Sequence, residues 1–150
     1  MHQSNVRLLA QNPDLRDTVI NGMARSVNAL PIRTGYKQAI DVNNIFETLR
    51  YIDMKRQPEN AIPFLPAIQR AYPLMSDQHA GWVITGAKWG NIGLLKASAQ
   101  LGEDAGPIVD CLRALLPDIQ RRAAGKGRQG TTFKPILEQT QKAIAAFSAK

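Results

Sequence analysis

Residues 107–134 read PIVDCLRALLPDIQRRAAGKGRQGTTFK, and this stretch decides the fold class because it joins the strongest apolar period in the chain to a cluster of positive charge. Four apolar residues recur in it at intervals of four, three and four positions: Ile108, Leu112, Leu115 and Ile119. This spacing places the four side chains on one side of an α-helix. The pattern predicts a core helix whose apolar face packs against the rest of the protein.

The basic end of this stretch begins the part of the chain that holds most of its net charge. Residues 1–120 contain 12 Lys and Arg against 11 Asp and Glu, whereas residues 121–150 contain 7 basic residues against 1 acidic residue. The first part has a balance of +1 and the second of +6, which add to the +7 of the whole chain. A local excess of this kind concentrates positive potential where a polyanion can dock.

The length and composition are typical of one globular domain. The chain has 150 residues, of which 44% are hydrophobic, 21% are charged and only 6% are aromatic. Such a length can bury a sizeable core without disulfides or metal, and the common residues favour helix. We therefore expect an all-α fold, a compact single-domain bundle of about five to seven helices over residues 1–150. Val19, Leu49 and Ile144 are expected in its core, because each belongs to an apolar stripe with helical spacing.

The middle of the chain is rich in proline. Four prolines exclude one long helix between residues 58 and 73 and leave only short turns: Pro58, Pro63, Pro66 and Pro73. Phe64, Leu65 and Ile68 lie between them and are expected to anchor the segment in the core.

Residues 78–101 fit two structures. Their spacing favours a helix that is broken near residues 86–90, where glycine would destabilise a continuous helix. The alternative is a small hairpin over residues 82–95, which would make the fold α+β.

Neither the cysteine usage nor the hydropathy indicates secretion or a membrane span. The single cysteine, Cys111, lies within the predicted core helix and is expected to be a buried, unreactive thiol. There is no apolar run of the length that a transmembrane helix needs, and no signal peptide is visible. We therefore expect a soluble, cytoplasmic protein.

No residue pattern predicts catalysis, a metal site or a cofactor site. The two histidines, His2 and His79, are far apart in the sequence and no cysteine or second histidine stands at ligand spacing from either. The acidic residues are scattered, and no pair is singled out as general acid and base. The sequence therefore favours a protein that is not an enzyme.

The candidate binding site is the basic segment after the core helix. Residues 121–134 are expected to form a flexible, glycine-rich loop, followed by a C-terminal helix capped at Thr132. The five cations of the predicted site are Arg121, Arg122, Lys126, Arg128 and Lys134. All of them are expected to lie outside the core.

The glycines of this segment spell G-x-G-x-x-G at Gly125, Gly127 and Gly130. In a dinucleotide-binding site a strand leads into this motif and a helix follows it, whereas here a helix precedes it and Pro135 follows. The Walker pattern also fails, because Thr131 stands where the phosphate-binding lysine would be. The sequence therefore predicts contacts with a phosphate backbone and no nucleotide cofactor.

Two functions agree with these patterns. In the first, the five cations bind DNA or RNA, mainly through the phosphates. In the second, the protein is an adaptor or structural interaction protein that binds a partner, for example an acidic protein, through its helical surfaces. A homodimer is compatible with both functions.

Overall fold

The computed structural model describes residues 15–50, 52, 57–86 and 93–149, and within these ranges it contains helices and turns but no strand. The elements in chain order are α2 (Arg16–Asn28), α3 (Lys37–Leu49), the 3-10 helix η1 (Pro58–Phe64), α4 (Leu65–Ala71), the 3-10 helix η2 (Tyr72–Leu74), α5 (Asp77–Thr85), α6 (Leu94–Leu101), the 3-10 helix η3 (Gly102–Ala105), α7 (Gly106–Ala123) and α8 (Arg128–Ser148). The predicted all-α class is confirmed.

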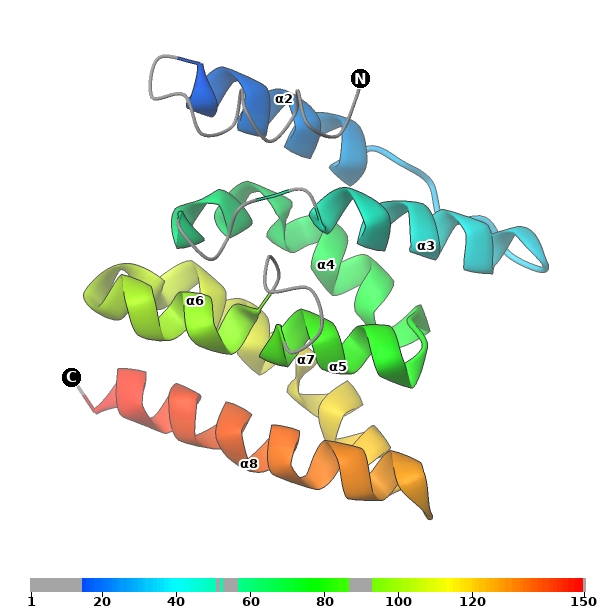
Figure 1. The fold of residues 1–150 in the computed structure, drawn as a ribbon, viewed down its shortest axis with the longest axis vertical. Coiled ribbons are helices and arrows are strands. Elements are labelled where there is room, and N and C mark those ends of the chain that lie inside the picture. The colour runs from blue at the N-terminus through cyan, green and yellow to red at the C-terminus, as the bar shows by residue number, and fades with distance from the viewer. Residues whose placement is uncertain (1–14, 51, 53–56, 87–92, 150) are drawn as a thin grey trace.

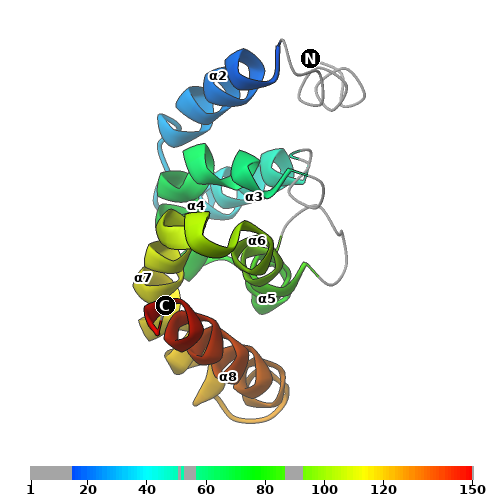
Figure 2. The ribbon, with the colours of Figure 1, turned by 90° about the vertical axis from the view of Figure 1, so that its left-hand side faces the viewer.

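The helices are stacked along the longest axis of the molecule, with α2 at one end and α8 at the other (Figure 1). The view in Figure 2 shows α3 to α7 between these two ends. Helix α7 packs against α4, α6 and α8, and α8 also contacts α5. The C-terminal part of the chain is therefore joined to the middle of the fold through both α5 and α7.

Helix α7 is the core helix that its apolar period predicts. Ile108, Leu112 and Ile119 are fully buried. Cys111 is buried beside them, and burial raises the pKa of its thiol to about 11, so it stays protonated at neutral pH. Pro117 lies within α7 and does not break the helix. The proline is on the exposed side of α7, so water can bind the carbonyl of the preceding turn that lacks an amide donor.

The proline-rich segment forms short elements, as expected. Phe64 and Ile68 are fully buried, and Leu65 is only 6% exposed. Asn28 at the end of α2 is bound to this segment by two hydrogen bonds: its Nδ2 donates to the Pro63 carbonyl at 2.9 Å, and its Oδ1 accepts from the Ala67 amide at 3.0 Å. The amide side chain thus replaces backbone partners that the prolines cannot supply.

The hairpin alternative for residues 82–95 is wrong in the described part of that segment. Ser76 caps α5 by accepting a hydrogen bond from the His79 amide at 3.2 Å, and the helix continues to Thr85. Gly86 then ends α5 in the left-handed conformation with φ of 69°. Gly93 precedes α6, which begins at Leu94, while residues 87–92 lie outside the described part of the chain.

Two of the predicted core residues, Val19 and Ile144, need correction. In α2 the buried residues are Ile20, Ala24 and Val27, whereas Val19 is only half-buried. Ile144 of α8 is also half-buried, while Leu49 of α3 is fully buried. A helix with apolar residues on more than one side can be buried along either of them, and contacts with η1 and α4 decide which side of α2 is buried.

The loop expected over residues 121–134 is much shorter. Helix α7 continues to Ala123 and α8 begins at Arg128, so only residues 124–127 lie between them. Thr132 lies inside α8, and the N-cap residue is Gly127 with φ of 69°. Glycine is needed at Gly127 for its positive φ, and at Gly130 because a Cβ atom there would collide with the Gly125 carbonyl oxygen. These glycines form a tight helix–helix corner.

The packing at Gly130 predicts a loss of stability on substitution. Gly130→Ala should lower the free energy of unfolding by about 1–3 kcal/mol, because the new methyl group meets a backbone oxygen that moves only if the corner opens. Gly22→Ala in α2 is the control and should raise the free energy of unfolding by up to about 1 kcal/mol, because its Cβ has room and helix propensity increases. Urea unfolding measures both, and equal effects would contradict the described corner.

Candidate polyanion-binding surface

Arg122 is the cation whose position differs from the prediction, because it is buried and does not lie outside the core. It lies in the last turn of α7 and is only 3% exposed. Its Nε donates to Asp118 Oδ2 at 2.7 Å, and its Nη1 donates to Asp77 Oδ1 at 2.5 Å. Its Nη2 donates to the carbonyls of Tyr72 at 3.2 Å and Met75 at 2.9 Å. The guanidinium therefore connects the end of α7 to η2 and to the start of α5.

Two aromatic rings complete the surroundings of Arg122. The guanidinium carbon lies 5.6 Å from the ring centroid of Tyr72 and 5.6 Å from that of Phe133 in α8. Burial lowers the pKa of the guanidinium, but the hydrogen bonds to Asp118 and Asp77 raise the pKa by more than burial lowers it. The pKa therefore lies above its ordinary value. Arg122 stays charged and holds three helices together. Its predicted place among the exposed cations is corrected.

Arg121 lies next to Arg122 but points to solvent. Its side chain is 60% exposed, and its Nη2 pairs with Asp118 Oδ1 at 2.5 Å. Asp118 thus accepts hydrogen bonds from both arginines, and its own side chain is only 10% exposed. Arg121 therefore contributes to the surface potential only in part, because a carboxylate already balances it.

The other three cations of the predicted site are exposed and have no ion pair or hydrogen bond from their side chains within the described ranges. They are Lys126 in the turn, Arg128 at the first position of α8, and Lys134. No acidic residue lies in the first turn of α8, where the helix dipole adds positive potential. Lys126 and Arg128 thus lie at the corner between α7 and α8, and Lys134 lies in the second turn of α8. We call these three residues the basic corner.

A groove next to the basic corner was not predicted from the sequence. It has a volume of about 690 Å³ and runs between α5 and α8, which lie side by side. Its walls include Gln78 and Trp82 from α5, and Arg128, Thr132 and Gln139 from α8. The sequence gives no signal for it, because the two walls are separated by about 50 residues and meet only in the folded chain.

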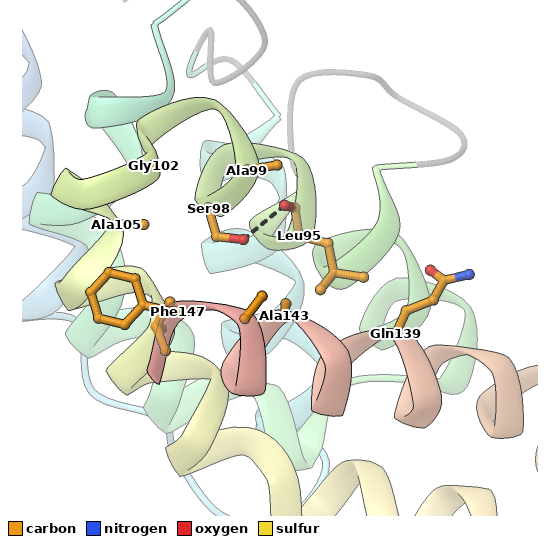
Figure 3. Close-up of a pocket in the computed structure, with 10 residues that line it drawn as sticks. Leu95, Ser98, Ala99, Gly102, Ala105, Gln139, Ala143 and Phe147 are labelled. Carbon is orange, nitrogen blue, oxygen red and sulfur yellow. Dashed lines mark hydrogen bonds between the residues drawn. The ribbon is translucent and has the colours of Figure 1, made fainter. Parts of the chain in front are cut away.

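A second cavity lies at the other end of α8 (Figure 3). It has a volume of about 290 Å³ and is lined mainly by small or apolar side chains, among them Leu95, Ala143 and Phe147. Its polar Ser98 is already engaged, since the hydroxyl donates to the Leu95 carbonyl at 2.8 Å. Gln139 also lines this cavity, and no charged residue does.

In the described part of the chain, no three His, Cys, Asp or Glu side chains lie close enough together to bind a metal ion. His79 stacks on Phe46 with a distance of 3.9 Å between ring centroids, and burial lowers the pKa of its imidazole. The other histidine, His2, lies outside the described residues. Among the described helices, none has the length and hydropathy needed to cross a membrane.

Comparison of the chain with models of protein families, with curated proteins and with solved structures finds no significant match.

The role of Arg122 predicts a large difference between two neighbouring arginines. Arg122→Met should lower the free energy of unfolding by about 3 kcal/mol, because Asp118 and several carbonyls lose a buried charged donor. Arg121→Met should cost less than about 1 kcal/mol, since the Arg121 side chain is 60% exposed and Asp118 keeps its hydrogen bond from Arg122. Thermal and urea unfolding monitored by circular dichroism measure both. Similar losses for the two variants would contradict the buried role of Arg122.

Proposed function

We propose that the protein binds nucleic acid through the phosphate backbone and that the basic corner makes the contacts. The observation that supports this proposal is the exposure of Lys126, Arg128 and Lys134, which have no acidic partners within the described residues. The sequence between them contains no acidic residue, and the next one is Glu138. An uncompensated group of this kind attracts a polyanion and releases its counterions on binding.

The arrangement favours contacts that do not depend on base sequence. Lysine and arginine bind phosphate oxygens by charge, and such contacts set position and affinity without reading the bases. The short corner places Lys126 and Arg128 next to the N-terminus of α8, where backbone amides also favour anions. Arg122 has a supporting role in this proposal, because it is buried and fixes the corner from within.

The proposal predicts a salt-dependent interaction that three substitutions weaken. With three phosphates neutralised, log affinity for duplex DNA should fall against log salt with a slope of about −2.7. Lys126→Gln, Arg128→Gln and Lys134→Gln together should weaken binding at about 50 mM salt, where screening is least, and flatten the slope towards zero. Fluorescence anisotropy of a labelled duplex over a series of salt concentrations measures both effects.

A matched control removes the same charge elsewhere. Arg25, Lys37 and Lys96 lie on α2, α3 and α6, away from the basic corner, and their combined change to Gln should leave most of the affinity and the slope. Equal losses in both triple variants would mean that only net charge matters. No binding to any nucleic acid at about 50 mM salt would end the proposal.

A role as a protein-binding adaptor is the second candidate, and the exposed side of α2 supports it. A groove of about 540 Å³ lies there, with Val19, Met23 and Leu30 among its lining residues. Leu30 is 40% exposed, and apolar surface of this kind is common where a partner binds. Co-purification with an acidic protein in the absence of nucleic acid would favour this function over the first.

A further inference from the structure

We infer that the groove between α5 and α8 holds an unpaired nucleobase, so that the preferred ligand is single-stranded nucleic acid. This inference rests on the proposed function and adds the class of nucleic acid that the protein selects. It depends on the position of the groove beside the basic corner, on the chemistry of its walls, and on its size.

The groove and the basic corner share one residue. Arg128 is the first residue of α8, where it belongs to the basic corner, and it also lines the groove. A phosphate bound at Arg128 therefore places the attached nucleotide at the mouth of the groove. The volume of about 690 Å³ lies within the range of sites that hold a small organic ligand.

The floor of the groove is apolar and close-packed. Gly81 of α5 faces Ile136 of α8, and a Cβ atom at Gly81 would lie 3.6 Å from Ile136 Cδ1. Ile136 is only 6% exposed, so the groove ends on packed side chains. The absence of a side chain at Gly81 leaves room between the two walls.

The walls carry the groups that bind a base. Trp82 is half-buried, and its ring packs against His79 at 5.6 Å and Phe46 at 6.3 Å between centroids. The part of the indole that lines the groove supplies the aromatic surface against which a base would stack. Gln78, Thr132 and Gln139 are exposed and, within the ranges described, their side chains make no hydrogen bond. Amide and hydroxyl groups can both donate to and accept from the edges of an unpaired base.

The one carboxylate of the groove does not oppose an anionic ligand with its full charge. Asp77 accepts from the buried Arg122 at 2.5 Å and from Gln129 Nε2 at 3.1 Å. The positive charge of Arg122 is therefore located where it offsets the carboxylate. Arg122 thus supports the groove as well as the corner.

The geometry selects single strands because a base within a duplex is stacked and paired. Such a base cannot enter a groove between two helices unless it leaves its stack, which costs a few kcal/mol. A single strand has no such cost and gains the stacking contact. We expect single-stranded DNA to bind about tenfold more tightly than a duplex of the same length at the same salt concentration.

The experiment uses the full chain with Trp89→Phe, which leaves Trp82 as the sole tryptophan because the sequence contains two. Addition of an unlabelled single-stranded oligonucleotide should quench the emission of Trp82, and an equal concentration of duplex should quench it far less. Gln78→Ala with Gln139→Ala should reduce the preference for single strands at least threefold. Gln120→Ala with Gln141→Ala, which changes two exposed glutamines outside the groove, should keep the preference.

The outcomes separate this inference from the proposed function. If single strands and duplex bind equally, with a salt slope and without a change in Trp82 emission, the groove is not a base site, while the phosphate contacts stand. If neither nucleic acid binds at about 50 mM salt, both proposals fail. A preference for single strands that survives in the Gln78→Ala, Gln139→Ala variant as fully as in its control would also overturn the assignment of the base to this groove.

Discussion

The buried charge of Arg122 is the constraint on which the C-terminal half of the structure depends. Removing a guanidinium from water costs several kcal/mol, and only close opposite charges and hydrogen bonds can offset that cost. Asp118 supplies one carboxylate from the same helix, and Asp77 supplies another from the start of α5. Carbonyls of Tyr72 and Met75 accept hydrogen bonds from its Nη2. Because the partners come from separate elements, the arginine fixes α7, η2 and α5 relative to one another.

This arrangement also decides which cations of residues 121–134 have no acidic partner among the described residues. Asp118 balances the charge of Arg122 and, in part, that of Arg121. The excess positive charge of residues 121–134 is therefore located on Lys126, Arg128 and Lys134. The glycines between the helices keep the connection short, since a side chain at Gly130 would strike the Gly125 carbonyl. The cations are therefore presented on a folded corner next to the groove, and a ligand bound there does not have to order a long loop first.

Sequence reasoning succeeded where the deciding interactions are local. The apolar period of α7 and the short proline-rich elements both follow from residues close together in the chain. Sequence reasoning failed where contacts between residues far apart in the chain decide the position of a side chain. Arg122 is buried because Asp77, 45 positions earlier, lies beside it, and nothing near Arg122 indicates this. Thr132 is a helix cap by local rules, yet α8 begins at Arg128 and continues through it. The groove has walls from α5 and α8, so no single stretch predicts it.

The inward position of Arg122 and the outward position of Arg128 are tested most directly by the arginine Nε–H signals in a nitrogen–proton NMR spectrum recorded during a titration with a single-stranded oligonucleotide. The Nε–H of Arg122 donates to Asp118 and is buried, so its signal should exchange slowly with water and stay in place as the oligonucleotide is added. The signal of Arg128 should move. An Arg122 signal that exchanges as fast as that of the exposed Arg25, or that shifts with the ligand while Arg128 does not, would contradict this division of roles.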